Sequence, residues 1–318
     1  MTDEKPENGN GEASRSAAPA ARTPASPPGL DPRRNAFRSD LAALSLRGQV
    51  IATRYAAGTV RQVTRPAVPL RREPNPALGL ETEALYGEML KVFDETEGWA
   101  WVQLQRDRYV GYLPSSALAG DVMPPSHRVK ALGTFIYPAA DIKTPPVMHL
   151  PLNAEVRVSE WGERFCHLER GGFVITRHLA ERDRFERDFV DVAERLIGSP
   201  YLWGGRTRIG IDCSGLVQMS LEAAGISAPR DTDMQAAELG EAIPVPDDLE
   251  SLQRGDLVFW KGHVGIMADG VMLVHANAHH MAVAVETLPE AVARIGKEQP
   301  ITTIRRLPGL TRAASTAA

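Results

Sequence analysis

The feature that most constrains the fold is a repeated pattern of short β-runs in the middle of the chain. Residues 111–118 begin Gly-Tyr and end in Leu, and residues 172–179 match them with Gly-Phe and a final Leu at a constant spacing. Hydrophobic and polar residues nearly alternate at 89–93, 99–104 and 109–113. Short strands separated by turn residues are typical of small β-barrels. We therefore predict an internal duplication of one such barrel.

The second copy carries strand patterns at 155–158, 165–168 and 172–175. In this alignment Cys166 takes the place of Val102. We therefore predict that Cys166 is a small buried hydrophobic residue and not a nucleophile.

The hydrophobic pattern changes after the second copy. Phe185, Phe189, Val192 and Leu196 recur at helical spacing, and Gly-Ser-Pro at 198–200 is expected to end that helix. A second helix is predicted to begin near Cys213 and to stop at Gly225. Four strands follow, at 256–260, 263–268, 271–275 and 281–285. Helices followed by an antiparallel meander indicate an α+β domain.

Composition excludes several classes of protein. The 318 residues are enough for two or three domains, and the net charge of −4 argues against nucleic acid as a partner. No stretch approaches the ~18 apolar residues that a membrane span needs. Residues 1–34 lack apolar periodicity and are expected to form a disordered tail without a secretory signal, which predicts a cytoplasmic protein. Two cysteines exclude a metal site built on cysteine pairs.

Cys213 is the candidate nucleophile. It follows Gly-Ile-Asp at a predicted helix N-terminus, where the helix dipole and unpaired N–H groups favour a thiolate and can hold an oxyanion. Asp212, one residue earlier, has two interpretations of equal weight. Its carboxylate either captures a substrate ammonium or caps the helix.

His263 and His275 are the candidate partners of the thiol, because a nucleophile needs a base and the base needs a group that orients it. A two-residue loop would place the two imidazoles on opposite faces of the sheet. We therefore predict a three-residue loop with a left-handed Gly270, in which His263 lies directly opposite His275. The His279-His280 pair is not expected to bind a metal, and no cofactor is expected.

These residues resemble the NlpC/P60 family of cysteine peptidases. The matching blocks are Tyr-Leu-Trp-Gly-Gly at 201–205, Asp-Cys-Ser-Gly-Leu-Val at 212–217, and the runs at 255–259, 262–266 and 274–276. The resemblance covers residues 183–306. With duplicated bacterial SH3 modules before it, the chain is most similar to the γ-D-glutamyl-L-diamino acid endopeptidases that recycle murein peptides.

The resemblance implies a role for each site residue. Cys213 would be the nucleophile, His263 the general base, and His275 the group that orients it. Tyr201 would line the site and help to polarise the scissile carbonyl. The residues implied in substrate binding are Asp212, Ser214, Trp203, Thr232, Glu81 and Tyr109, with Glu83 as an alternative to Glu81.

The resemblance also implies the fold class and the domain limits. The chain is expected to be multidomain, with two small SH3-like β-barrels followed by an α+β papain-like cysteine peptidase domain. The expected parts are a disordered tail at 1–34, an N-terminal segment and first bacterial SH3 domain at 35–122, a second at 123–182, the NlpC/P60 domain at 183–308, and a disordered tail at 309–318.

The function expected from this resemblance is hydrolysis of the γ-D-glutamyl-L-diamino acid bond in murein peptides with a free N-terminal L-Ala. The expected partner is a murein-derived peptide, without nucleic acid or membrane. Three alternatives stay open: an exported hydrolase of intact murein, a non-catalytic SH3 protein that binds the cell wall, and an acyltransferase.

Overall fold

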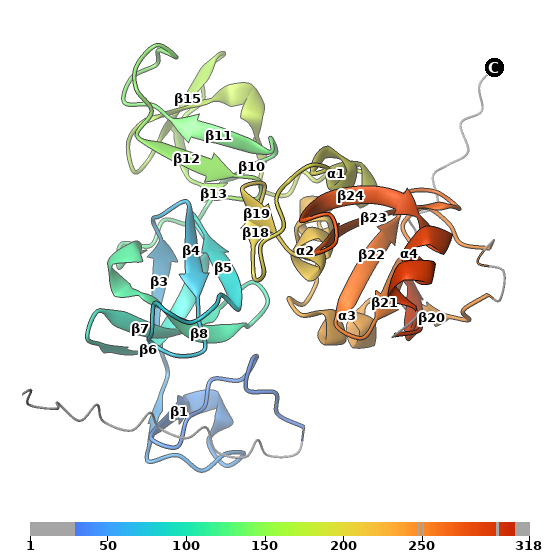
Figure 1. The fold of residues 1–318 in the computed structure, drawn as a ribbon. Helices are drawn as coiled ribbons and strands as arrows, with labels where there is room; N and C mark the ends of the chain where they lie inside the picture. The colour runs from blue at the N-terminus through green and yellow to red at the C-terminus, as the bar shows by residue number, and fades with distance from the viewer. Residues whose placement is uncertain (1–28, 247–248, 250, 297–298, 309–318) are drawn as a thin grey trace, which may run out of the picture.

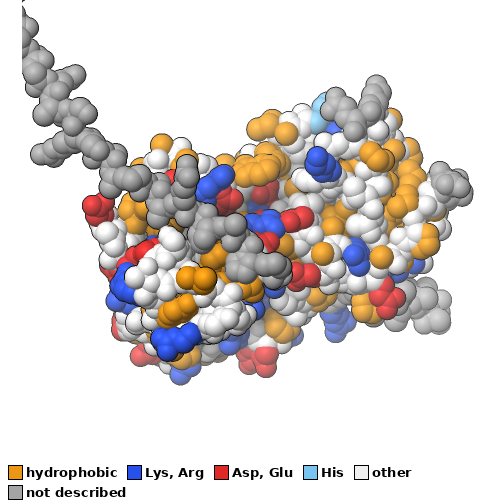
Figure 2. Space-filling view, turned by 90° about the horizontal axis from the view of Figure 1, so that it is seen from below, with side chains coloured by type: hydrophobic (Ala, Val, Ile, Leu, Met, Phe, Trp, Pro, Cys, Tyr) orange, Lys and Arg blue, Asp and Glu red, His pale blue; other side chains and the backbone are white. Residues whose placement is uncertain are grey.

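The computed structural model describes residues 29–246, 249, 251–296 and 299–308. Figure 1 shows the second β-module above the first, the N-terminal segment below the first, and a helix-containing C-terminal domain beside them. No helix in the described ranges is long and apolar enough to cross a membrane. On the face shown in Figure 2, acidic and basic side chains are interspersed and do not gather by sign.

The N-terminal segment contains the parallel strands β1 (Leu41–Ala43) and β2 (Arg54–Ala56), with a 3₁₀ turn at Leu44–Leu46 between them. Its buried side chains, among them Phe37 and Leu41, form one hydrophobic cluster with Trp101 of the first β-module. Packing against that module gives this short segment a buried face.

The predicted N-terminal tail is partly wrong. Residues 1–28 lie outside the described residues, but the part at 29–34 is folded. The N–H groups of Arg34 and Asn35 both donate to the carbonyl of Asp31, which forms a turn. Arg33 and Arg34 form ion pairs with residues about 200 positions later. These contacts are tertiary, so composition did not reveal them.

The first β-module has a five-stranded sheet in the order β8-β7-β6-β3-β9 and a hairpin, β4-β5. Its strands are β3 (Thr59–Val63), β4 (Ala67–Leu70), β5 (Thr82–Leu85), β6 (Met89–Thr96), β7 (Trp99–Leu104), β8 (Val110–Pro114) and β9 (Leu118–Ala119). A tight turn at Glu97-Gly98 joins β6 to β7, and both residues have positive φ, at 51° and 80°. Two such residues match the right-handed twist of a tight hairpin.

The second β-module repeats this hydrogen-bonding pattern. Gly87 donates its N–H to Val63, and Asn153 donates to Val129 in the corresponding place. The strands are β10 (His127–Val129), β11 (Gly133–Ile136), β12 (Met148–Pro151), β13 (Glu155–Val156), β14 (Val158–Glu160), β15 (Phe165–Leu168), β16 (Phe173–Ile175) and β17 (Leu179–Glu181). The module has its own core, separate from that of the first.

Cys166 is fully buried in this second core, as predicted, but its predicted alignment is wrong. Cys166 pairs with Val174, and Val174 corresponds to Leu113 of the first module. The partner of Leu113 is Ala100, so Cys166 takes the place of Ala100 and not of Val102. The turn between β15 and β16 is shorter than the turn between β7 and β8. The constant offset between the two modules therefore holds after this turn but not before it.

The C-terminal domain has a six-stranded sheet in the order β20-β25-β21-β22-β23-β24, with helices on both faces (Figure 1). The helices are α1 (Phe189–Arg195), α2 (Cys213–Ala223), α3 (Thr232–Glu238) and α4 (Leu288–Ile295). The strands are β18 (Arg206–Thr207), β19 (Gly210–Ile211), β20 (Glu241–Ile243), β21 (Leu257–Trp260), β22 (His263–Met267), β23 (Met272–Asn277), β24 (Ala282–Thr287) and β25 (Thr303–Arg306).

Alternation along the strands explains the layers. Phe259 and Val264 share a cluster with helices α1 and α2, whereas Trp260 and Leu273 share one with α4. Successive residues of a strand point to opposite faces, so one sheet serves two helical layers. Helix α2 ends as predicted, with Gly225 in the left-handed region at φ 79°.

Helix α1 begins later than predicted. Asp188 caps it by accepting the N–H of Val190 at 2.8 Å, and the helix starts at Phe189. Phe185 therefore lies outside the helix and is exposed, with the Arg128 guanidinium 5.0 Å from the centre of its ring. The Asp188 cap sets the start of the helix, although the apolar spacing suggested an earlier start.

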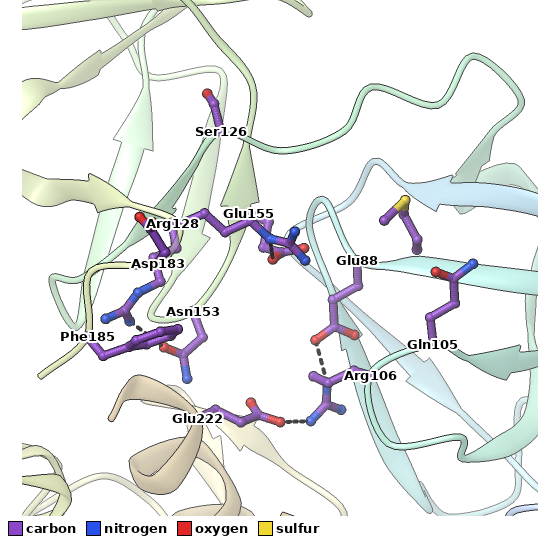
Figure 3. A pocket seen from close by; sticks show the side chains of 12 residues that line it. Glu88, Gln105, Arg106, Ser126, Arg128, Asn153, Glu155, Asp183, Phe185 and Glu222 are labelled. Atoms are coloured by element: carbon purple, nitrogen blue, oxygen red, sulfur yellow. Dashed lines mark hydrogen bonds and ion pairs between the residues drawn. The ribbon is translucent and has the colours of Figure 1, made fainter. Parts of the chain in front are cut away.

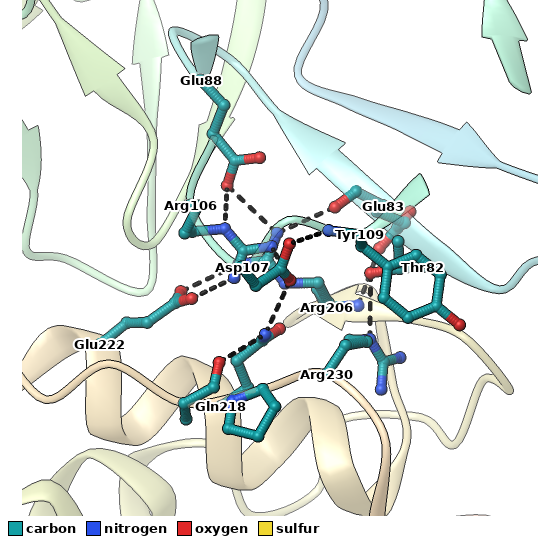
Figure 4. A network of polar contacts seen from close by, with 12 residues as sticks. Thr82, Glu83, Glu88, Arg106, Asp107, Tyr109, Arg206, Gln218, Glu222 and Arg230 are labelled. Atoms are coloured by element: carbon teal, nitrogen blue, oxygen red, sulfur yellow. Dashed lines mark hydrogen bonds and ion pairs between the residues drawn. The ribbon is translucent and has the colours of Figure 1, made fainter. Parts of the chain in front are cut away.

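A buried ionic network joins the first β-module to α2 (Figure 4). The Arg206 side chain has no solvent exposure and contacts Glu88 of the module at 3.1 Å and Glu222 of α2 at 2.9 Å. Arg106 contacts the same two glutamates. Buried charges of this kind cost much free energy unless each is paired, so the network fixes how the module sits on the domain.

Replacing Arg206 with methionine should lower the free energy of unfolding by about 3–5 kcal/mol, because two buried glutamates lose a partner. Urea unfolding followed by tryptophan fluorescence measures this. The matched control is Arg208→Met, since Arg208 is exposed two residues later in the chain. Equal stability of the two variants would show that the network does not hold the interface.

A cavity of about 700 Å³ lies where the two β-modules meet α2 (Figure 3). Side chains from all three parts line it, including Glu88, Glu155, Arg128 and Glu222. Burial raises the pKa of the Glu155 carboxyl, although its ion pair with Arg182 opposes this. The junction is therefore polar and incompletely packed.

Candidate functional site

Cys213 is the first residue of α2, as the sequence predicted. Asp212 caps the helix by accepting the N–H of Gly215 at 2.7 Å, and it also accepts the N–H of Gly204 at 2.7 Å. The capping interpretation of Asp212 is thereby confirmed. Only 6% of Cys213 is exposed, so the helix presents its thiol in a largely buried position.

The Cys213 thiol was expected to be a thiolate, but its surroundings oppose this. Burial and the Asp212 carboxylate raise the pKa of Cys213 to about 11. The backbone of Val264 and the Thr232 hydroxyl, which lies 3.9 Å from Sγ, act in the other direction and lower this pKa. Desolvation outweighs the helix N-terminus, so the resting group is a neutral thiol that needs a base.

The hairpin that carries the histidines has a three-residue loop, as predicted, but its two strands pair in a different register from the predicted one. Ala268 donates its N–H to the carbonyl of Met272 at 2.7 Å, which leaves 269–271 as the loop. The Asp269 carboxylate closes the loop by accepting the N–H of Met272 at 2.7 Å. Gly270, which was predicted to be left-handed, is not among the glycines with positive φ. The aspartate sets this turn, so it needs no left-handed glycine.

The two histidines still lie on one face of the sheet. Ile266 pairs with Val274, and continuing this register places His275 opposite Gly265, diagonal to His263. The observed register differs from the predicted one by two residues, and a shift of two leaves every side chain on the same face. Diagonal neighbours are within reach for aromatic side chains.

The histidines form the start of a hydrogen-bonded chain. Nε2 of His263 lies 2.8 Å from Nδ1 of His275, and Nε2 of His275 lies 2.7 Å from Oε1 of Glu286 on β24. Arg294 of α4 forms an ion pair with the same glutamate. Burial lowers the pKa of His263 and of His275 to about 3, with His275 and Arg294 respectively as the next causes. Both rings are therefore neutral at physiological pH.

The strand β22 links the thiol to the histidines along the chain. The backbone of Val264, which lowers the pKa of the Cys213 thiol, directly follows His263, the first residue of the strand. In the part of the chain that the structure describes, no hydrogen bond joins the sulfur to either imidazole. Catalytic contacts are often long before substrate binds, so this arrangement is a resting one.

Tyr201 lies half-buried near the thiol. Burial, the Cys213 sulfur and the Asp212 carboxylate together raise the pKa of Tyr201 to about 12, so its hydroxyl keeps its proton. Trp203 is 67% exposed on the loop that follows, and Thr232 begins α3 beside the thiol. Tyr201 and Thr232 therefore lie at the thiol, and the role of Trp203 stays a prediction.

Asp212 and Ser214 have partners that the sequence did not reveal. Arg230 is almost fully buried and donates to Asp212 at 2.8 Å and to Ser214 at 2.8 Å. It also donates to Thr82 of the first β-module at 3.0 Å. A substrate ammonium would have to displace this arginine to reach Asp212, so the predicted ammonium site does not fit the observed contacts.

The two predicted residues of the first β-module lie at its boundary with the peptidase-like domain. The Tyr109 hydroxyl donates to Asp231, the residue before α3, at 3.1 Å. Glu81 forms an ion pair with Arg72 at 3.0 Å and acts electrostatically on Tyr109. A cavity of about 600 Å³ contains Glu81 and Tyr109 in its lining, along with Arg33.

Glu83, the alternative to Glu81, is buried more deeply. Its carboxylate accepts the backbone N–H of Arg206 at 2.8 Å, and burial raises its pKa (Figure 4). This contact gives Glu83 a part in the interface between the modules. Glu81 is the more exposed acid of the two.

His275, His280 and Glu286 lie close enough together to suggest a metal site. Glu286 and His280 already have other partners. Arg294 pairs with Glu286, and Nδ1 of His280 lies 3.0 Å from Oδ1 of Asn277. The Arg294 cation beside the carboxylate opposes a metal cation there. The observed contacts therefore favour a hydrogen-bonding role for Glu286.

Three functional candidates were missed from the sequence: Arg230, Glu286 and Arg33. Arg230 and Glu286 are charged residues whose side chains are mostly buried, which is unusual without a specific partner. Whether Glu286 shares a face of the sheet with His275 depends on how their two strands pair, which the sequence alone does not show. Arg33 lies in a segment whose composition concealed its fold.

Comparison with known families identifies two parts of the chain. Residues 70–118 match the bacterial dipeptidyl-peptidase Sh3 domain, and residues 198–294 match the NlpC/P60 family. The two matches coincide with the first β-module and with the domain that carries Cys213 and the histidines.

Two curated relatives are dipeptidyl-peptidases. Gamma-D-glutamyl-L-lysine dipeptidyl-peptidase from Bacillus subtilis (strain 168) is 28% identical over 241 residues, which are 67% of this chain and 77% of that protein. Dipeptidyl-peptidase 6 from Lysinibacillus sphaericus is 35% identical over 117 residues, 36% of this chain and 41% of that protein. The chain thus spans less than half of one relative and about three quarters of the other.

The fold also resembles a solved structure. The crystal structure of an NlpC/P60 family protein from Bacillus cereus ATCC 10987 superposes with a TM-score of 0.66 at 19% identity, covering 78% of this chain and 99% of that one. The predicted SH3-like domain followed by an NlpC/P60 domain is confirmed. Residues 198–294 are thus similar to the NlpC/P60 family, and residues 70–118, ahead of them, to the bacterial dipeptidyl-peptidase Sh3 domain.

Proposed function

We propose that the protein is a cysteine endopeptidase that hydrolyses the γ-D-glutamyl-L-diamino acid bond of murein peptides with a free N-terminal L-Ala. Two observations support the proposal: a buried thiol begins α2, with the backbone of Val264, the residue after His263, near enough to lower its pKa, and the sheet of the same domain carries a hydrogen-bonded pair of neutral histidines. The name of the Bacillus subtilis relative gives the bond type. We also propose that the second β-module is a second bacterial SH3 domain, and that the domain limits are those expected from the sequence.

The reaction follows from these groups. The Cys213 sulfur attacks the γ-carbonyl carbon of D-Glu while its proton passes to Nδ1 of His263. The backbone N–H of Cys213 and the Tyr201 hydroxyl stabilise the oxyanion. The C–N bond then breaks, and His263 gives the proton to the leaving amine of the diamino acid. Water attacks the thioester, His263 takes its proton, and the γ-carboxylate and the thiol are released.

The substrate N-terminus is proposed to lie at the end of the site that faces the first SH3 domain. Tyr109, Glu81 and Asp231 lie there, and both carboxylates act on Tyr109 electrostatically. A carboxylate attracts an ammonium, and the SH3 domain is proposed to exclude a longer chain beyond it. Selectivity for a free L-Ala would thus come from both charge and exclusion. A place in the cytoplasm and in cell-wall recycling stays a prediction.

Incubation with L-Ala-γ-D-Glu-L-Lys and with its N-acetylated form tests the proposal. Mass spectrometry should detect L-Ala-D-Glu and free lysine from the first peptide and at least about tenfold slower cleavage of the second, as expected from the loss of one charge-assisted contact of about 1.5–3 kcal/mol. Equal cleavage of both would refute the free-amine requirement. Cleavage of neither would refute the proposed activity.

The N-terminal segment is expected to affect substrate binding through Arg33. Its guanidinium contacts Asp231 at 2.8 Å and Asp233 at 2.7 Å, next to Thr232. Asp231 makes no side-chain cap to α3, so Arg33 and Tyr109 hold its carboxylate. Arg33→Ala should raise KM for L-Ala-γ-D-Glu-L-Lys about two- to fivefold and leave kcat within about twofold, since exposed charge pairs contribute up to ~1 kcal/mol.

Arg34→Ala is the matched control for this prediction. Arg34 is the next residue and pairs with Glu238 at the far end of the same helix, away from Thr232. Its KM should stay at the wild-type value. Equal effects of the two variants would mean that the segment acts only through general stability.

A further inference from the structure

Glu286 extends the pair of histidines by one more group. On β24 it lies opposite Leu273, two residues from the partner of His275, and therefore on the same face of the sheet as His275. Its Oε1 is 2.7 Å from Nε2 of His275, which has no solvent exposure. Arg294 donates to that same oxygen.

We propose that Glu286 is a positioning residue that fixes which nitrogen carries the proton on both His275 and His263. The inference rests on the proposed peptidase function for its consequence, but the placement of the protons follows from the hydrogen bonds alone. Glu286 does not touch the thiol or the substrate. It acts through His275.

The proton positions follow step by step from the carboxylate. A carboxylate only accepts, so Nε2 of His275 must carry the proton that bridges the 2.7 Å contact. In a neutral ring the other nitrogen is then an acceptor, so Nδ1 of His275 accepts from Nε2 of His263 across 2.8 Å. His263 is left with its proton on Nε2 and a free lone pair on Nδ1.

That lone pair is what the reaction requires. Since Nε2 of His263 is engaged by His275, only Nδ1 can accept the thiol proton. If the chain of bonds ran the other way, Nδ1 of His263 would carry a proton and could not act as a base. The hydrogen-bond acceptor at position 286 therefore keeps Nδ1 of His263 free to accept a proton, although Glu286 does not contact His263.

Arg294 holds Glu286 in place and also influences the charge of the chain. Its cation, together with His280, disfavours a positive charge on His275, so the pair stays neutral in spite of the nearby carboxylate. The glutamate therefore acts by accepting a hydrogen bond rather than by charging the histidine. Glu286 therefore determines which nitrogen of His263 carries the proton and leaves the charge of the ring unchanged.

Three variants separate this role from a merely structural one. Glu286→Met removes the acceptor and should lower kcat about 10²- to 10⁴-fold with little change in KM, which is the range for a misplaced catalytic proton. Glu286→Gln keeps Oε1 as an acceptor and should lose less than about tenfold. Arg294→Met removes the ion pair that holds Glu286 but not the acceptor, and should lower kcat less than Glu286→Met does.

A readout independent of turnover completes the test. The ¹⁵N chemical shifts of labelled histidines at neutral pH should show His263 protonated on Nε2 in the wild type and partly on Nδ1 in Glu286→Met. Wild-type His263 protonated on Nδ1 would overturn the proposal, as would a folded Glu286→Met variant with wild-type kcat and unchanged shifts. If the wild type cleaves no murein peptide, the proposed activity fails while these shifts still decide the role of Glu286.

Discussion

Replacing Cys213 with alanine should lower the rate of cleavage of L-Ala-γ-D-Glu-L-Lys at least about 10⁴-fold, the range seen when a covalent nucleophile is removed. The site offers no substitute, since the only other cysteine, Cys166, is buried in the core of the second β-module. The loss of one sulfur at a helix start should leave the fold intact. Single-turnover assays by mass spectrometry measure the rate.

Cys166→Ala is the control for this prediction. It also removes a buried thiol, from a core that does not contact the site, and should cost stability without changing kcat. A Cys213→Ala variant that cleaves the peptide within tenfold of the wild-type rate would exclude covalent catalysis at this position. The protein would then be better explained as a binding protein.

Replacing His263 with glutamine should lower kcat about 10³- to 10⁴-fold, because the neutral Cys213 thiol would lose its only base. Burial raises the pKa of that thiol to about 11, so few molecules carry a thiolate at neutral pH. Burial also lowers the pKa of His263 to about 3, so the base form persists in weak acid. As pH is lowered, kcat/KM should accordingly begin to decline only at a pH below 6.5, the ordinary pKa of histidine.

His279→Gln provides the comparison, since His279 is exposed on the turn after β23. Its kcat and pH profile should match those of the wild type. The rate of Cys213 alkylation by iodoacetamide gives a second measurement, and it should rise with pH more slowly in His263→Gln. Wild-type kinetics in His263→Gln would remove the histidine from the mechanism.

The sequence predicted the local parts of the site well. The start of α2 at Cys213, its end before Gly225, and the strands that carry His263 and His275 all depend on neighbouring residues. Helix caps, left-handed glycines and strand alternation act over a few positions, so one sequence reveals them. The cap at Asp212 belongs to the same class.

The parts that failed depend on contacts between distant residues. The exact hairpin register was decided by the Asp269 side chain, and Arg33 meets Asp231 across 198 positions of sequence. Arg230 joins Thr82 to the residues around the nucleophile, again between modules. No local pattern encodes such pairs, since a charged residue on its own predicts a solvated surface.

The same limit applies to the state of the nucleophile. A helix N-terminus suggests a thiolate, but how deeply Cys213 is buried depends on Val264 and on the packing of α2 against the sheet. Desolvation of the thiol depends on tertiary packing, and its effect on the pKa of Cys213 exceeds that of the helix N-terminus. The mechanism therefore relies on a base and on correctly placed protons rather than on a preformed ion pair.

The most direct test of the account uses an irreversible analogue of the substrate, in which a vinyl sulfone replaces the scissile γ-amide of L-Ala-γ-D-Glu-L-Lys. After incubation, intact mass and peptide mapping locate the label. The account predicts one label per molecule, on Cys213, blocked by excess L-Ala-γ-D-Glu-L-Lys and much slower in His263→Gln. Labelling of Cys166, or no labelling by a protein that still cleaves the peptide, would contradict it.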